Sequence, residues 1–187
     1  MMKKLILPLF LLATMFACKS PESKTETAAN PEDTETGSFV SMDEKSAIFK
    51  RVMEAAMKND TAVYREAFAD SLIVLDGFAE NVDSLNKLKA TPEGINALIK
   101  GDSYLHSLYD DIAMTTEKGQ IKTFTFTDGR VVSGYWGIWS AKGKFSKKVS
   151  RVPLHMIGWW KGNKVVQIYR LFDPASLKEE IAASQKK

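Results

Sequence analysis

The chain of 187 residues has a single cysteine and two histidines, and it lacks an apolar run of membrane-spanning length. One cysteine excludes an intrachain disulfide. The longest apolar run, Leu5 to Phe16, is too short to span a bilayer comfortably. The GxSxG elbow, the P-loop, the dinucleotide fingerprint and the HExxH motif are all absent. Any enzymatic activity would therefore be acid/base chemistry without a cofactor, and we expect no cofactor.

Neither sign of charge dominates, with 26 Lys and Arg against 23 Asp and Glu. Lys3 and Lys4 precede the apolar run, and Ala17 and Cys18 follow it, which is the layout of a secretory signal over residues 1–17. The position of Cys18 resembles a bacterial lipobox, in which this cysteine becomes the lipidated N-terminus. An ordinary signal peptide cut nearby, or an uncleaved anchor, is the alternative. We expect a lipid-anchored protein of the bacterial cell envelope, facing the periplasm or the surface.

Without its signal the chain would be close to neutral, because the signal carries two of the 26 basic residues and no acidic ones. That balance gives no electrostatic reason to bind nucleic acid. The next segment, residues 18–40, is rich in Glu, Thr, Ser and Pro and has almost nothing apolar to bury. We predict a disordered tether there. The folded domain is expected over residues 41–187.

Helices come first in this domain. Ser41 and Glu44 match a capping box and predict a helix start. Apolar residues then recur at helical spacing in two short segments separated by Asn59-Asp60, followed by the strand-like SLIVLD. Thr91-Pro92 predicts the start of a third helix, with an apolar stripe that runs to Tyr109 and contains Gly101.

Strands follow. DIAMTTE, IKTFTFT, RVVSGYWGIWS, KVSRVPLHMIGWW and KVVQIYRLF are strand-like and are separated by turns, of which Asp128-Gly129 and Gly162-Asn163 predict hairpins. The segment PASLKEEIAAS predicts a closing helix. Helices followed by an antiparallel meander indicate an α+β domain.

This pattern resembles the NTF2-like superfamily, in particular its SnoaL-like branch of polyketide cyclases, which is related to ketosteroid isomerases. The resemblance covers about residues 41–180 and is carried by the helix order, by SLIVLD and by the ending WWKGNKVVQIYRLFDPASL. The motif positions read Gly162, Lys164, Val165, Asp173 and Leu177. The family often continues with a glutamine where this chain has Glu180.

The resemblance implies a cone: a strongly curved antiparallel sheet packed against about three N-terminal helices, with a mostly apolar pocket between them. It also implies a homodimer formed through the outer face of the sheet. The residue pattern independently supports a sheet that is covered on both faces. In the strand RVVSGYWGIWS, Tyr135 and Trp139 alternate with Trp136 and Ile138, so both faces of that strand carry large apolar groups.

Asp173 is the first candidate site residue. In the cyclases that the chain resembles, an aspartate at the end of the last strand is the general acid/base. A carboxylate in an apolar pocket would have a raised pKa, which suits this role. Equally, an aspartate before Pro174 is a good helix cap, with its oxygen accepting the amide of Ser176. Both interpretations stay open.

His155 and Tyr169 are the candidates that would assist Asp173. With a two-residue turn at Gly162-Asn163, His155 would pair with Arg170, and Asp173 would pair with a residue on the opposite face from His155. Simple pleating would therefore keep the two apart unless a bulge intervened. Core packing is the alternative role for both His155 and Tyr169.

Trp136, Trp139 and Tyr64 are the residues expected to contact a flat ligand, although such rings also fill cores and interfaces. Asp102 and His106 lie four residues apart on a predicted helix, but two ligands without a third make a weak metal signal. We expect no metal site.

Three functions are compatible with the sequence. The first is a membrane-tethered domain that binds a small apolar or aromatic molecule in its pocket. The second is a SnoaL-like isomerase or cyclase that uses Asp173 as acid/base. The third is a protein-protein interaction module of the envelope.

Overall fold

A computed structural model describes residues 36–41, 43–76 and 91–186. The predicted signal peptide, Cys18 and most of the predicted tether lie outside these residues. Within them, no helix is both long enough and apolar enough to cross a membrane. The folded part begins before the predicted boundary at residue 41, because Gly37–Val40 forms a strand that pairs with another.

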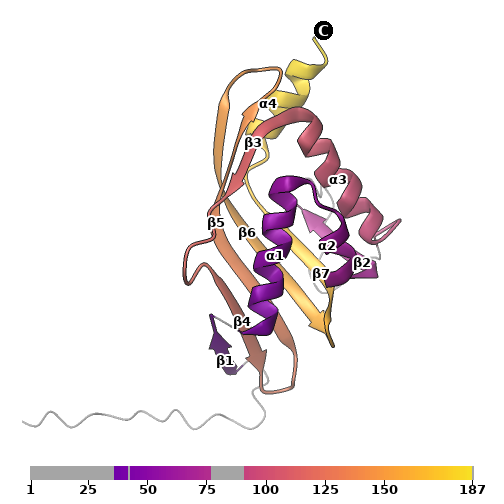
Figure 1. The fold of residues 1–187 in the computed structure, drawn as a ribbon, viewed down its shortest axis with the longest axis vertical. Helices are drawn as coiled ribbons and strands as arrows, with labels where there is room; N and C mark the ends of the chain where they lie inside the picture. Colours follow the sequence, from indigo (N-terminus) through magenta and orange to yellow (C-terminus); the bar gives the residue numbers. More distant parts are fainter. Residues whose placement is uncertain (1–35, 42, 77–90, 187) are drawn as a thin grey trace, which may run out of the picture. The chain divides into compact units, whose positions relative to one another are not determined.

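The strands of the described part form one mixed sheet in the order β1-β4-β5-β6-β7-β2, with β3 paired to β5 (Figure 1). Their bounds are β1 Gly37–Val40, β2 Phe68–Asp76, β3 Tyr109–Met114, β4 Ile121–Phe126, β5 Val131–Gly143, β6 Val149–Lys161 and β7 Lys164–Leu171. The first part of β5 pairs with β4, and its last part pairs with β3. The α+β class is confirmed, but β2 runs parallel to β7, so the sheet is not antiparallel throughout.

Four helices belong to the described part: α1 Glu44–Lys58, α2 Ala62–Ala67, α3 Ile95–Leu108 and α4 Ala175–Ser184. The cap of α1 is Asp43, whose Oδ1 accepts the amide of Ser46 at 2.7 Å, while the Ser46 hydroxyl oxygen accepts the amide of Asp43. The predicted Ser41–Glu44 box is therefore wrong, because the helix begins two positions later. Asp43 also accepts a hydrogen bond from Thr123 at 2.8 Å, which joins the helix start to β4.

Helix α3 begins later than Thr91-Pro92 predicted. The hydroxyl oxygen of Thr91 instead accepts the amide of Val74 at 2.7 Å, and Gly94, with φ of 53°, precedes the first helical residue. The helix continues through Gly101 and ends at Leu108, so Tyr109 belongs to β3.

The helices cover one face of the sheet. Phe49 of α1 packs so closely on β6 that a Cβ at Gly158 would lie 2.8 Å from its ring. Figure 1 shows α1 in front of β6 and β7, with α3 and α4 toward the other end of the same face. The buried core between these layers includes Phe49, Met53, Tyr64 and Leu72, each no more than 1% exposed. The pocket described below lies between the helices and the sheet as well.

The β6–β7 hairpin has the predicted turn but a different register. Lys161 pairs with Lys164 across Gly162-Asn163, and a bulge then shifts the pairing between Trp159 and Trp160. As a result His155 pairs with Leu171, and Met156 pairs with Arg170. Because side chains alternate along a strand, this shift turns Arg170 toward the same face as Met156, the face that the helices cover.

Candidate functional site

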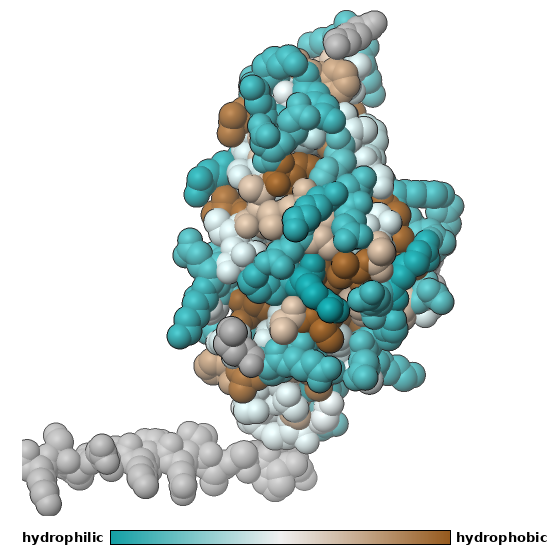
Figure 2. All heavy atoms as spheres, in the orientation of Figure 1, coloured by the Kyte–Doolittle hydropathy of each residue, from teal (hydrophilic) through white to brown (hydrophobic). Residues whose placement is uncertain are grey.

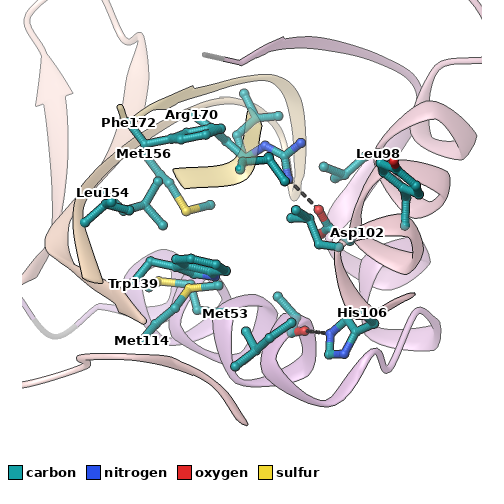
Figure 3. A pocket seen from close by; sticks show the side chains of 18 of the residues that line it. Met53, Leu98, Asp102, His106, Met114, Trp139, Leu154, Met156, Arg170 and Phe172 are labelled. Carbon is teal, nitrogen blue, oxygen red and sulfur yellow. Dashed lines mark hydrogen bonds and ion pairs between the residues drawn. The ribbon is translucent and has the colours of Figure 1, made fainter. Parts of the chain in front are cut away.

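A pocket of about 320 Å³ lies between the helices and the sheet. Its walls are largely apolar, and α1, α3, β3, β5, β6 and the segment after β7 all contribute to them. Figure 3 shows Asp102 and His106 of α3 on one side of the pocket and an apolar wall opposite. That wall includes Met114, Trp139, Leu154 and Met156. Thioether and indole groups together adapt to flat apolar molecules of varied outline.

Three side chains in the pocket form a polar network. The Tyr64 hydroxyl donates to Oδ2 of Asp102 at 2.6 Å. Nη1 of Arg170 donates to Oδ1 of the same carboxylate, as Figure 3 shows. The side chains of Arg170 and Asp102 are only 14% and 11% exposed. An ion pair so far removed from water needs both partners, since either charge alone would be costly to bury. The network therefore supplies polarity without a net charge.

Tyr64 acts in this network as a neutral donor. Burial, together with the negative charge of Asp102, raises the pKa of the Tyr64 phenol well above its usual value. The phenol therefore stays protonated at any physiological pH. Its hydroxyl hydrogen is committed to Asp102, which leaves the phenol oxygen as an acceptor within the pocket.

His106 holds the base of the pocket to helix α1. Its Nε2 lies 2.7 Å from the carbonyl oxygen of Ala56. A carbonyl can only accept, so Nε2 carries the hydrogen, and in the neutral ring Nδ1 carries the lone pair. Asp102 and His106, the pair considered as metal ligands, each bond to a different protein group. Among the described residues, no three His, Cys, Asp or Glu side chains group as a metal site.

Asp173 lines the pocket but is itself exposed. Its Oδ1 accepts the amide of Ala175 at 2.9 Å. The predicted cap bond to Ser176 is therefore replaced by a bond one residue earlier, which forms a local turn before α4. The carboxylate of Asp173 therefore accepts a backbone amide at the start of α4, as a helix-capping group does.

Of the three residues expected to contact a ligand, Tyr64 and Trp139 line the pocket and Trp136 does not. Trp136 is 42% exposed and stacks on His155, with ring centroids 5.0 Å apart. Tyr169 packs on Trp159 at 4.3 Å and bonds to Gln167. The alternation of β5, β6 and β7 puts these side chains on the sheet face away from the pocket. His155 and Tyr169 therefore do not join Asp173 in one site.

Sequence reasoning missed Arg170 as a site residue and noticed Asp102 only as half of a metal pair. The available signal was a lone arginine between apolar residues near the end of β7. A charge in such a position is buried only when it is paired.

Helix α4 closes one end of the pocket and is held by Glu180. This side chain is 1% exposed, and its carboxylate accepts the amide of Phe145 at 2.6 Å and the amide of Ser146 at 3.1 Å. It also accepts the hydroxyl of Ser146. These bonds fix α4 against the β5–β6 turn, and α4 supplies Leu177 and Ile181 to the pocket.

The molecular surface viewed in Figure 2 is mostly hydrophilic, with apolar residues in separate patches.

No protein-family model matches the sequence, and no curated protein matches it. Solved structures do match. A putative isomerase from Bacillus subtilis has a TM-score of 0.55 at 13% identity, over 76% of this chain and 97% of that chain. A putative SnoaL-like polyketide cyclase from Jannaschia sp. CCS1 has a TM-score of 0.52 at 14% identity, over 74% of this chain and 92% of that chain.

A third match is an NTF2-like protein of unknown function from Burkholderia pseudomallei, with a TM-score of 0.52 at 14% identity. It covers 76% of this chain and 100% of that one. At such low identities the likeness concerns the fold, and function has to be argued from the site. The helices, the sheet order and these matches agree that the chain has the NTF2-like fold.

Proposed function

We propose that this protein binds a small apolar or aromatic molecule in the pocket of its NTF2-like domain. The observation that carries the proposal is the pocket itself: about 320 Å³, largely apolar walls, and one ion-paired polar network at its side. Such a combination is typical of small-molecule sites, where apolar walls give affinity and a few polar groups give orientation. The lipid anchor at Cys18 and the tether would hold this domain at a membrane of the bacterial envelope.

An isomerase or cyclase is the second candidate. It is favoured by the place of Asp173 in the pocket wall and by the likeness in fold to a putative isomerase and a putative polyketide cyclase. The bond from the Ala175 amide to the Asp173 carboxylate favours binding without turnover. His155 and Tyr169, on the other face, are no part of this candidate.

Gly101 offers a direct test of the pocket. It lies in α3 and in the pocket wall, and a Cβ added there would meet only Nη2 of Arg170, at 3.9 Å. We expect Gly101→Leu to reduce the affinity for 2-naphthol at least tenfold in equilibrium dialysis, because the longer side chain occupies the space of the ligand.

Gly101→Ala is the matched control. It adds only the Cβ and should raise the free energy of unfolding by about 0.5–1 kcal/mol, since alanine is the better helix former. The affinity of Gly101→Ala for 2-naphthol should stay within about twofold of the wild type. Equal affinity in the leucine variant and the wild type would show that the probe binds elsewhere, and the proposal would fail.

A further inference from the structure

We propose that Asp102 determines the charge class of the ligand, so that the pocket takes uncharged molecules and rejects carboxylates. This inference rests on the proposed function, since it concerns the same pocket. It starts from the fact that the pocket contains an arginine, a residue that usually binds anionic ligands.

The cation of Arg170 is already neutralised by the protein. Nη1 of Arg170 bonds to Oδ1 of Asp102, and both side chains are at least 86% buried. Asp102 is fixed in turn by Tyr64, which donates to its second oxygen at 2.6 Å. A ligand carboxylate entering beside this network would meet the negative Asp102 as well as the positive Arg170. It would lose its hydration without gaining an unbalanced positive partner.

A ligand ammonium meets the converse obstacle, because Arg170 repels it. An uncharged ligand loses little hydration and packs its rings on Trp139, Met114 and Met156. The phenol oxygen of Tyr64, whose hydrogen is committed to Asp102, offers an acceptor for one ligand hydroxyl. The geometry therefore favours a flat, uncharged molecule with one hydroxyl group.

Three probes with the same ring system test this inference: 2-naphthol, 2-naphthoate and 2-naphthylmethylammonium. With the wild-type protein at pH 7, equilibrium dialysis should give 2-naphthol an affinity at least about tenfold higher than that of either ion. A wild-type protein that binds 2-naphthoate as tightly as 2-naphthol, or more tightly, would overturn the inference.

Charge substitutions give the matched comparison. Asp102→Asn keeps an oxygen acceptor for Tyr64 but removes the negative charge, so the 2-naphthoate to 2-naphthol affinity ratio should rise at least about tenfold. Arg170→Met should shift the preference toward the ammonium probe. The double variant Asp102→Asn/Arg170→Met has no charge at this position and should again prefer 2-naphthol. A preference that is the same in all four proteins would contradict the role of Asp102.

A pH series with the wild-type protein keeps the inference testable if the single variants fold poorly. If only the uncharged acid binds, the apparent affinity for 2-naphthoate should fall about tenfold per pH unit above the pKa of the free acid. The affinity for 2-naphthol should stay constant. A pH-independent affinity for 2-naphthoate would contradict this inference alone, whereas failure of all three probes to bind would overturn the proposed function and this inference with it.

Discussion

Replacing Asp102 with alanine is expected to lower the free energy of unfolding by about 3 kcal/mol. The carboxylate accepts both the Tyr64 hydroxyl and the Arg170 guanidinium in a region that is only slightly exposed. Removal leaves a buried cation and a buried hydroxyl without this acceptor, which costs more than the pair contributes when it is intact. Urea denaturation followed by circular dichroism measures the change.

Tyr64→Phe is the control for this substitution. It removes one hydroxyl and leaves the ion pair of Asp102 and Arg170, so about 1–2 kcal/mol should be lost. In the double variant Tyr64→Phe/Asp102→Ala, the combined cost should be smaller than the sum of the two, because both residues belong to one network. A smaller loss in Asp102→Ala than in Tyr64→Phe would show that the ion pair does not stabilise the fold.

Glu180→Ala should have a comparable effect, a loss of about 3 kcal/mol. The substitution removes the acceptor of the Phe145 and Ser146 amides and leaves space where a 1% exposed side chain was packed. The neighbouring Glu179 is the matched control, because its side chain is exposed and forms an ion pair with Lys148 at the surface. Glu179→Ala should cost less than about 0.5 kcal/mol. Equal losses in the two variants would contradict the structural role of Glu180.

The carboxylate of Glu180 should also make the stability of the protein depend on pH. Burial raises the pKa of Glu180, but the hydrogen bonds from the hydroxyl and amide of Ser146 and the amide of Phe145 outweigh it, and the pKa lies below its ordinary value of 4.5. A lowered pKa means that the unfolded chain binds the proton more readily. The contribution of Glu180 is therefore complete above pH 4.5 and is lost as the pH falls through the lower, folded-state pKa.

Stability curves measured between pH 7 and pH 3 should show this loss as a steeper acid limb in the wild type than in Glu180→Gln. Glutamine is neutral throughout, so its amide oxygen accepts hydrogen bonds independently of pH. Parallel acid limbs in the two proteins would contradict the assignment.

Local patterns predicted most of the secondary structure. The helical spacing of the apolar residues before Asn59-Asp60 indicated α1, and the Gly162-Asn163 turn indicated the last hairpin. These features depend on neighbours in the sequence, and a pattern of a few residues is enough to show them. The helix cap moved from Ser41 to Asp43 because several polar residues there can cap and tertiary contact with Thr123 favours one of them.

The site could be predicted only in part, because it depends on contacts between distant segments. Tyr64 and Trp139 were found from their residue type. The Asp102–Arg170 pair joins positions 68 residues apart, and Arg170 faces the pocket only because of a bulge between Trp159 and Trp160. No short sequence pattern indicates that bulge, and a shift of one residue exchanges the two faces of a strand. The same shift placed His155 opposite Leu171 instead of Arg170.

Glu180 shows how a departure from a family pattern can carry structural information. The family often has glutamine at this position, and the sequence alone gave no reason for the change. In the structure a carboxylate accepts three donors from Phe145 and Ser146. A glutamine has one acceptor oxygen in place of two, so it could not reproduce this set.

The most direct test of the binding pocket is an NMR titration of the protein labelled with ¹³C in its methionine methyl groups. Met53, Met114 and Met156 line the pocket from three different elements. With added 2-naphthol, we predict that these three methyl signals shift together and saturate with a single dissociation constant, and that Gly101→Leu raises this dissociation constant at least tenfold. Unchanged signals from all three methionines at saturating probe, or the same dissociation constant in Gly101→Leu as in the wild type, would contradict binding in this pocket.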